Sequence, residues 1–151
     1  MKKLLLLPAL VVVIWAAIAL TWQIRIARSL RTLETTDYFS YQGCWTETVP
    51  GRRAAGELLD AGVRALPALV RSMTPEKSAA YHTEASFLIR QIATRASGMS
   101  WAEMTPYAIE METPPAERAR KCRLIQGWWL ESGGSIRSSA WRPWERGYRL
   151  E

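Results

Sequence analysis

An uninterrupted apolar stretch opens the chain. The residues from Leu4 to Trp22 carry no charge, and they directly follow Lys2 and Lys3. A helix of that length spans roughly 28 Å, close to the thickness of the hydrocarbon core of a bilayer. In lipid, a single segment can satisfy its backbone hydrogen bonds only as a helix. The pattern therefore predicts one transmembrane helix, with Trp22 anchoring its C-terminal end at the interface.

A cleaved secretory signal is the alternative interpretation of the same stretch. The residues Ala17–Ala19 form a candidate cleavage site, and cleavage there would release a secreted domain that begins at Leu20. The apolar run continues past this site to Trp22, however, and a signal would not need that length. We therefore favour a retained single-pass anchor.

The orientation of the anchor is nearly balanced between the two sides of the membrane. The short N-terminal tail before the span is typical of signal anchors and favours an extracytoplasmic domain. The basic residues that follow the span favour the reverse; they are Arg25, Arg28 and Arg31. We expect the domain outside the cytoplasm.

Beyond the span, apolar residues recur at spacings of three and four, which is typical of amphipathic helices. Residues 23–34 continue the membrane helix, and residues 35–51 are predicted to be an aromatic loop rich in turn formers. Four further helices are predicted over residues 52–61, 65–73, 74–97 and 113–133. No segment alternates with a period of two over strand length, so the chain is predicted to be all-α.

Glycine and proline set the predicted ends of these helices. Gly62 and Gly98 are expected to stop the first and third, and Thr74 followed by Pro75 is expected to start the third. The pair Gly133–Gly134 is expected to end the fourth. The predicted organisation is an anchor over residues 1–34, a loop over 35–51, a helical domain over 52–134 and a basic aromatic tail over 135–151.

One part of the predicted domain resembles a known family. Residues 54–70 combine an Ala/Leu helix, a Gly turn at Gly62 and a second helix that opens with Ala65-Leu66-Pro67-Ala68-Leu69. This arrangement resembles a HEAT-type repeat, and it implies an antiparallel pair of helices. Only one repeat is recognisable, whereas a solenoid needs about three. The resemblance implies a scaffold or partner-binding protein with no catalytic residues.

The positive charge of the chain lies at its two ends. The net charge is +6, and residues 1–34 and 116–151 each contribute +4 while residues 35–115 contribute −2. The N-terminal share is ordinary membrane flanking. A nucleic-acid partner is therefore not expected, and the predicted partners are membrane lipid and another protein.

No residue pattern indicates catalysis, a metal or a cofactor. His82 is the only histidine and has no neighbouring nucleophile, so it is expected to be structural. Two cysteines that lie far apart do not form a metal motif. Cys44 and Cys122 would form a disulfide in an oxidising compartment, and otherwise they are two separate small residues. We expect a non-enzymatic protein.

The C-terminal region holds the candidate contact residues. Arginine next to aromatic side chains is typical of protein interfaces, lipid surfaces and stacked nucleic-acid sites. The tail either binds a partner or folds back over the helical core. The leading hypothesis is a membrane-anchored protein-binding or scaffold protein, for example an accessory subunit of a membrane complex. The alternatives are binding of an anionic surface, either lipid or nucleic acid, through the basic tail, and a secreted helical domain after signal cleavage. The predicted contact residues are Trp128, Trp129, Trp141, Arg142 and Trp144.

Overall fold

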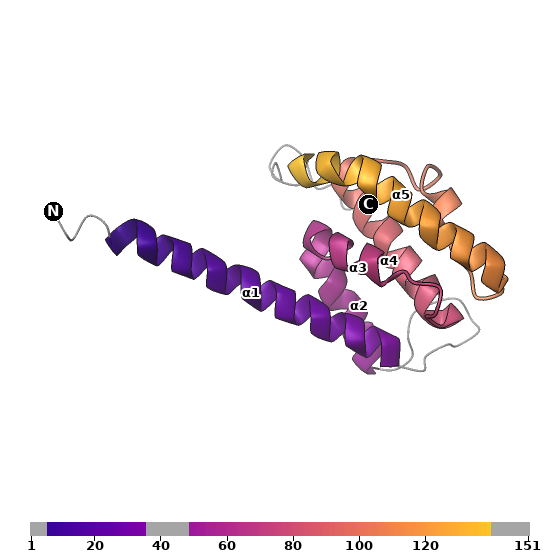
Figure 1. Cartoon of the computed structure of the whole chain (residues 1–151), viewed down its shortest axis with the longest axis horizontal. Helices are drawn as coiled ribbons and strands as arrows, with labels where there is room; N and C mark the ends of the chain where they lie inside the picture. The colour runs from indigo at the N-terminus through magenta and orange to yellow at the C-terminus, as the bar shows by residue number, and fades with distance from the viewer. Residues whose placement is uncertain (1–5, 36–48, 140–151) are drawn as a thin grey trace.

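The computed structural model describes residues 6–35 and 49–139, and every regular element within these ranges is helical (Figure 1). The long N-terminal apolar helix is followed by four α-helices and two short 3₁₀ turns, which confirms the predicted all-α class. The elements are α1 (Leu6–Thr35), α2 (Val49–Ala61), η1 (Gly62–Arg64), α3 (Leu66–Ser72), α4 (Ala79–Ser97), η2 (Thr105–Tyr107) and α5 (Pro115–Ser139).

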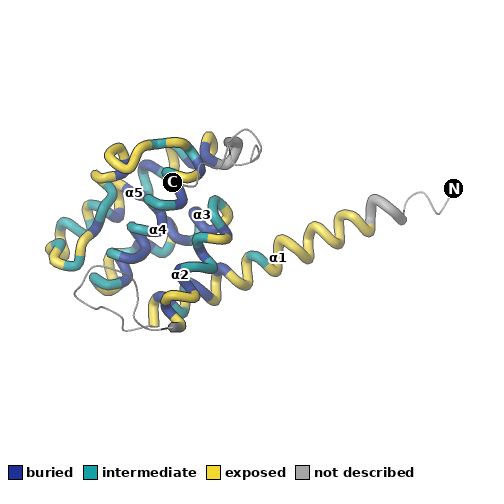
Figure 2. The backbone as a smooth tube through the Cα atoms, turned by 180° about the vertical axis from the view of Figure 1, so that it is seen from behind, coloured by how far each residue is buried: buried dark blue, intermediate teal, exposed yellow. Residues whose placement is uncertain are grey.

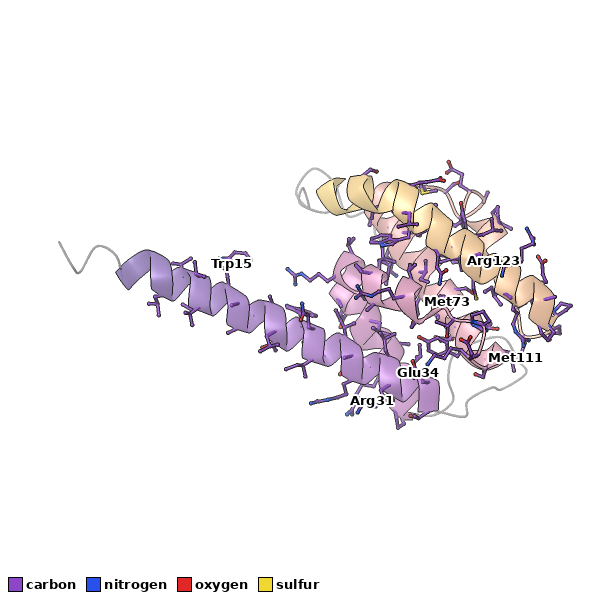
Figure 3. The ribbon with its side chains drawn as sticks, in the orientation of Figure 1. Trp15, Arg31, Glu34, Met73, Met111 and Arg123 are labelled. Carbon is purple, nitrogen blue, oxygen red and sulfur yellow. The ribbon has the colours of Figure 1, made fainter. Side chains whose placement is uncertain are left out.

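The two halves of α1 have different surroundings. Residues 10–20 are exposed and apolar and project away from the rest of the chain (Figure 2). Trp15 stands out from this half, whereas Glu34 at the other end lies against the domain (Figure 3). By length and composition α1 is able to cross a membrane, and a signal sequence near an N-terminus has the same character.

The C-terminal half of α1 belongs to the folded domain. Ile26 and Leu33 are buried in the same core as α2. The Ser29 hydroxyl donates a 2.6 Å hydrogen bond to the Glu57 carboxylate on α2. Glu34 forms a 2.9 Å ion pair with Lys77. Residues 23–34 continue the helix, as predicted, and they pack on α2 because the apolar stripe of α1 faces it.

Helix α4 lies at the centre of the domain. It packs against α2, α3 and α5. Its inward positions are spaced by three and four, and they are fully buried; they include Ala85, Leu88, Ile89, Ile92 and Ala93. Helix α5 closes the core with Cys122, Ile125 and Ile136.

Glycine ends two helices as predicted. Gly62 (φ 56°) follows α2 and Gly98 (φ 74°) caps α4, and both adopt the left-handed conformation that side chains with a Cβ disfavour. The predicted start of α4 at Thr74 is wrong. The N-cap is Ser78, whose hydroxyl accepts a 3.1 Å bond from the Tyr81 N–H. Thr74 instead begins a turn, in which its carbonyl accepts from the Lys77 N–H and the His82 ring.

The predicted end of α5 at Gly133–Gly134 is also wrong. The helix continues to Ser139, so the first residues of the predicted tail are helical. Ile136 is buried, and its burial in the core holds the last turns in place after two weak helix formers. Helix propensity alone therefore does not determine where α5 ends, because the burial of a later residue extends the helix.

The pairing of helices differs from that implied by the repeat resemblance. A HEAT-type pair would bring α2 and α3 face to face, yet the chief neighbour of α2 is α1, and α3 packs on α4 and α5. The apolar stripe of α2 is therefore covered by the helix that precedes it. The resemblance of residues 54–70 to such a repeat stays a prediction.

Candidate partner-binding surface

The predicted contact residues differ in how far they are buried and in whether the structure describes them. Trp128 is 6% exposed and packs beside Tyr107, with ring centroids 5.6 Å apart, so it offers a partner little area. Trp129 is partly buried, 6.1 Å from the Trp128 ring. The other three, Trp141, Arg142 and Trp144, lie outside the described residues. Only Trp129 among the described candidates keeps an accessible edge.

Trp129 is held in place by the helix beneath it. A Cβ built on Gly133 would lie 2.9 Å from two carbons of the Trp129 indole. Real Cβ atoms do not approach other atoms so closely, so the indole can lie flat over the next turn only because residue 133 is glycine. The Trp129 indole thus explains why residue 133 is glycine.

The outer face of α5 carries an apolar strip that the sequence interpretation missed. Leu130 is 84% exposed and Leu124 is 40% exposed. Gly127 and Gly134 lie on the same face, and a Cβ on either would meet no atom within 4 Å. We name Leu124, Gly127, Leu130 and Gly134 the α5 strip. The spacing of three and four residues was visible in the sequence, but it did not distinguish an exposed strip from a buried one.

The inner face of α5 is fixed by polar contacts to the domain. Gln126 donates a 3.0 Å bond to the Met73 carbonyl, and Lys121 donates to the Ala108 carbonyl. These bonds set the rotation of α5 about its axis. The α5 strip therefore faces away from the core as a consequence of the fold.

The predicted disulfide involves one described cysteine. Cys122 is buried on the inner face of α5, and burial raises the pKa of its thiol. A raised pKa keeps the thiol protonated and unreactive at neutral pH. Cys44 lies outside the described residues, so its pairing with Cys122 stays a prediction.

Several polar side chains are buried along α4. The Glu84 carboxylate is buried, and burial raises its pKa. Ser86 bridges α4 to the next segment, because its hydroxyl accepts a 3.1 Å bond from the Ile109 N–H. Within residues 6–35 and 49–139, no three histidine, cysteine, aspartate or glutamate side chains gather in a way that would hold a metal ion.

His82 is fully buried and is bonded through one ring nitrogen. Its Nε2 lies 2.8 Å from the Thr74 carbonyl oxygen, which can only accept, so this nitrogen carries a hydrogen and donates it. Burial lowers the pKa of His82 below its ordinary value of 6.5. This geometry fits a structural histidine that fixes the turn before α4.

We expect stability to fall on mild acidification because of His82. In the unfolded chain the imidazole ring is protonated near its ordinary pKa, whereas in the folded chain it is protonated only at a lower pH. Stability is therefore complete above about pH 6.5 and is lost as the pH falls toward the lower folded pKa. His82→Gln keeps a donor for Thr74, and its melting temperature should vary less than that of the wild type between about pH 7 and pH 5. Parallel melting curves by circular dichroism test this, and equal slopes would contradict it.

Comparison of the chain with protein-family models, with curated proteins and with solved structures yields no match.

Proposed function

We propose that this chain is a single-pass, membrane-anchored protein-binding module without enzymatic activity. Helix α1 holds the domain at the bilayer, and the α5 strip binds a helix of another protein. The observation that carries the proposal is the combination of a strongly exposed Leu130 with Gly127 and Gly134, two glycines that no contact among the described residues explains.

The two glycines favour a helix as the partner. Glycine in the middle of a helix costs about 1 kcal/mol relative to alanine. At Gly133 this cost is offset because the Trp129 indole packs where a Cβ would lie, whereas Gly127 and Gly134 face open space. Small residues on a helix face let a second helix approach closely, and Leu130 between them would fill the hole on the partner. Trp129 borders this surface, and Trp141, Arg142 and Trp144 follow α5 in sequence as further proposed contacts.

The structure of α1 favours a scaffold over a loosely tethered domain. The helix is continuous from its exposed apolar half into the half that packs on α2. A membrane span joined in this way restricts how the domain is presented relative to the bilayer. A fixed presentation is useful to a protein that positions a partner at the membrane.

The test is purification of the tagged full-length protein from its native membranes in mild detergent. We expect a co-purifying protein that cross-links to a photoreactive residue placed at position 130. Leu130→Glu and Gly127→Leu should remove that protein, because they put charge or bulk on the α5 strip. Gly56→Ala is the matched control, since Gly56 is also an open helical glycine but lies on α2.

Four outcomes bear on the proposal. Loss of the partner in both strip variants with retention in the control supports it. Retention of the partner in both strip variants would overturn the assignment of the surface.

A wild-type protein that runs as a lone monomer, with no cross-link at position 130, would overturn the proposed function. A species of twice the monomer mass that the strip variants abolish would identify the partner as a second copy of this chain.

A further inference from the structure

Two arginines from different parts of the chain meet on one tryptophan. The Arg25 guanidinium carbon lies 5.0 Å from the centroid of the Trp22 ring, and that of Arg64 lies 5.1 Å from the same ring. Arg25 follows Trp22 on α1, whereas Arg64 belongs to η1. The fold therefore builds a cluster of one indole and two guanidinium groups, which we name the Trp22 cluster.

The Trp22 cluster lies where the apolar half of α1 ends. Residues 10–21 are exposed, and Trp22 is the first of the described side chains of α1 that packs against the core. The free half of α1 projects from the side of the domain at which α5 also ends (Figures 1 and 2). If α1 spans the bilayer, the Trp22 cluster lies at the level of the lipid headgroups, where tryptophan is enriched.

Within the described part of the chain, no carboxylate pairs with either guanidinium group. Both arginine side chains are exposed. Two like charges on one ring repel each other, and an anion between or beside them would relieve that repulsion. Guanidinium groups bind phosphate oxygens by paired hydrogen bonds. A zwitterionic headgroup carries its phosphate beside a cation that the two arginines repel, so a phosphate in a headgroup of net negative charge suits the site better.

We infer that the Trp22 cluster binds the phosphate group of an anionic phospholipid. Arg25 and Arg64 bind the headgroup oxygens, and the Trp22 indole lies at the boundary between headgroup and acyl chain. Because Arg64 belongs to the domain and Arg25 to the membrane helix, one bound lipid holds the two together and sets the tilt of the domain. This inference rests on the membrane insertion of α1 that is part of the proposed function.

The test uses the full-length protein in a zwitterionic detergent, titrated with short-chain phosphatidylglycerol and, separately, with short-chain phosphatidylcholine. We expect tighter binding of phosphatidylglycerol by microscale thermophoresis. Arg25→Gln and Arg64→Gln should each weaken it about fivefold, and the double variant by roughly the product, from the typical contribution of one basic residue at an anionic surface. Arg123→Gln is the matched control, because Arg123 is an exposed arginine on α5 (Figure 3).

The controls separate the inference from the proposed function. Melting curves in detergent without added lipid should be the same for wild type and variants, since both arginines are exposed. Equal affinity of the wild type for the two lipids, an unchanged affinity in the double variant, or equally tight binding of inorganic phosphate would overturn the lipid site.

Alkaline extraction of native membranes tests the anchor independently. Protein that stays in the membrane but shows no preference for phosphatidylglycerol refutes only the lipid site. Protein that is released into the aqueous fraction refutes membrane insertion.

Discussion

Replacing Leu33 by alanine is expected to lower the free energy of unfolding by about 2–5 kcal/mol. Leu33 lies near the end of α1 and is 1% exposed, in the same core as α2 and α4. The substitution removes buried methyl groups and leaves a cavity that the neighbouring helices cannot fully close. The loss would come from a residue of the N-terminal apolar helix, and it would show that α1 is part of the domain.

Ile24→Ala is the matched control for Leu33→Ala. Ile24 lies on the same helix but is 51% exposed, so its truncation removes no core contact and should leave the stability of the domain nearly unchanged. Thermal unfolding of both variants in the same detergent, followed by circular dichroism, measures the difference. Equal melting temperatures for Leu33→Ala and the wild type would show that α1 is only a tether.

Replacing Gly133 by alanine is expected to destabilise the protein, although alanine is the better helix former. The new methyl group would lie 2.9 Å from the Trp129 indole, and the ring would have to move. Overpacking of this kind costs about 1–3 kcal/mol, which exceeds the roughly 1 kcal/mol that alanine contributes through helix propensity. The displaced indole should also change the near-ultraviolet circular dichroism.

Gly134→Ala provides the comparison one residue further along α5. A Cβ at this position meets nothing within 4 Å, so only helix propensity acts, and stability should rise by up to about 1 kcal/mol. The two adjacent alanine variants are thus expected to change stability in opposite directions. Melting temperatures measured side by side decide the matter, and a gain in both variants would mean that Trp129 does not lie over Gly133.

The sequence predicted most of the helices because their signals are local. The stops at Gly62 and Gly98 follow from the need for a left-handed residue at a helix end, and both were found where expected. The end of α5 was missed because it depends on Ile136, whose burial is a tertiary property. Likewise, Ser78 was not recognised as the cap of α4, because Thr74 and Pro75 carry the same local start signal but form a turn before the helix.

The candidate surfaces were harder to predict than the elements. The apolar spacing of Ile26, Leu30 and Leu33 was evident, but nothing in it indicated that α2 is its partner. Trp128 and Leu130 are both large apolar residues on α5, and only the rotation of the helix decides that the first is buried and the second exposed. The meeting of Arg25 and Arg64 on Trp22 joins residues far apart in the sequence, and no local pattern reveals it.

The central claim is that α1 is one unbroken helix, embedded in lipid over its first half and locked into the domain over its second. Hydrogen–deuterium exchange of the full-length protein in phospholipid nanodiscs tests it most directly. We expect slow amide exchange from residue 10 through residue 35, without a rapidly exchanging break between Trp22 and Ile26. Fast exchange over residues 10–21 would show that this half is not in the bilayer, and fast exchange over residues 26–35 would show that α1 is not part of the domain.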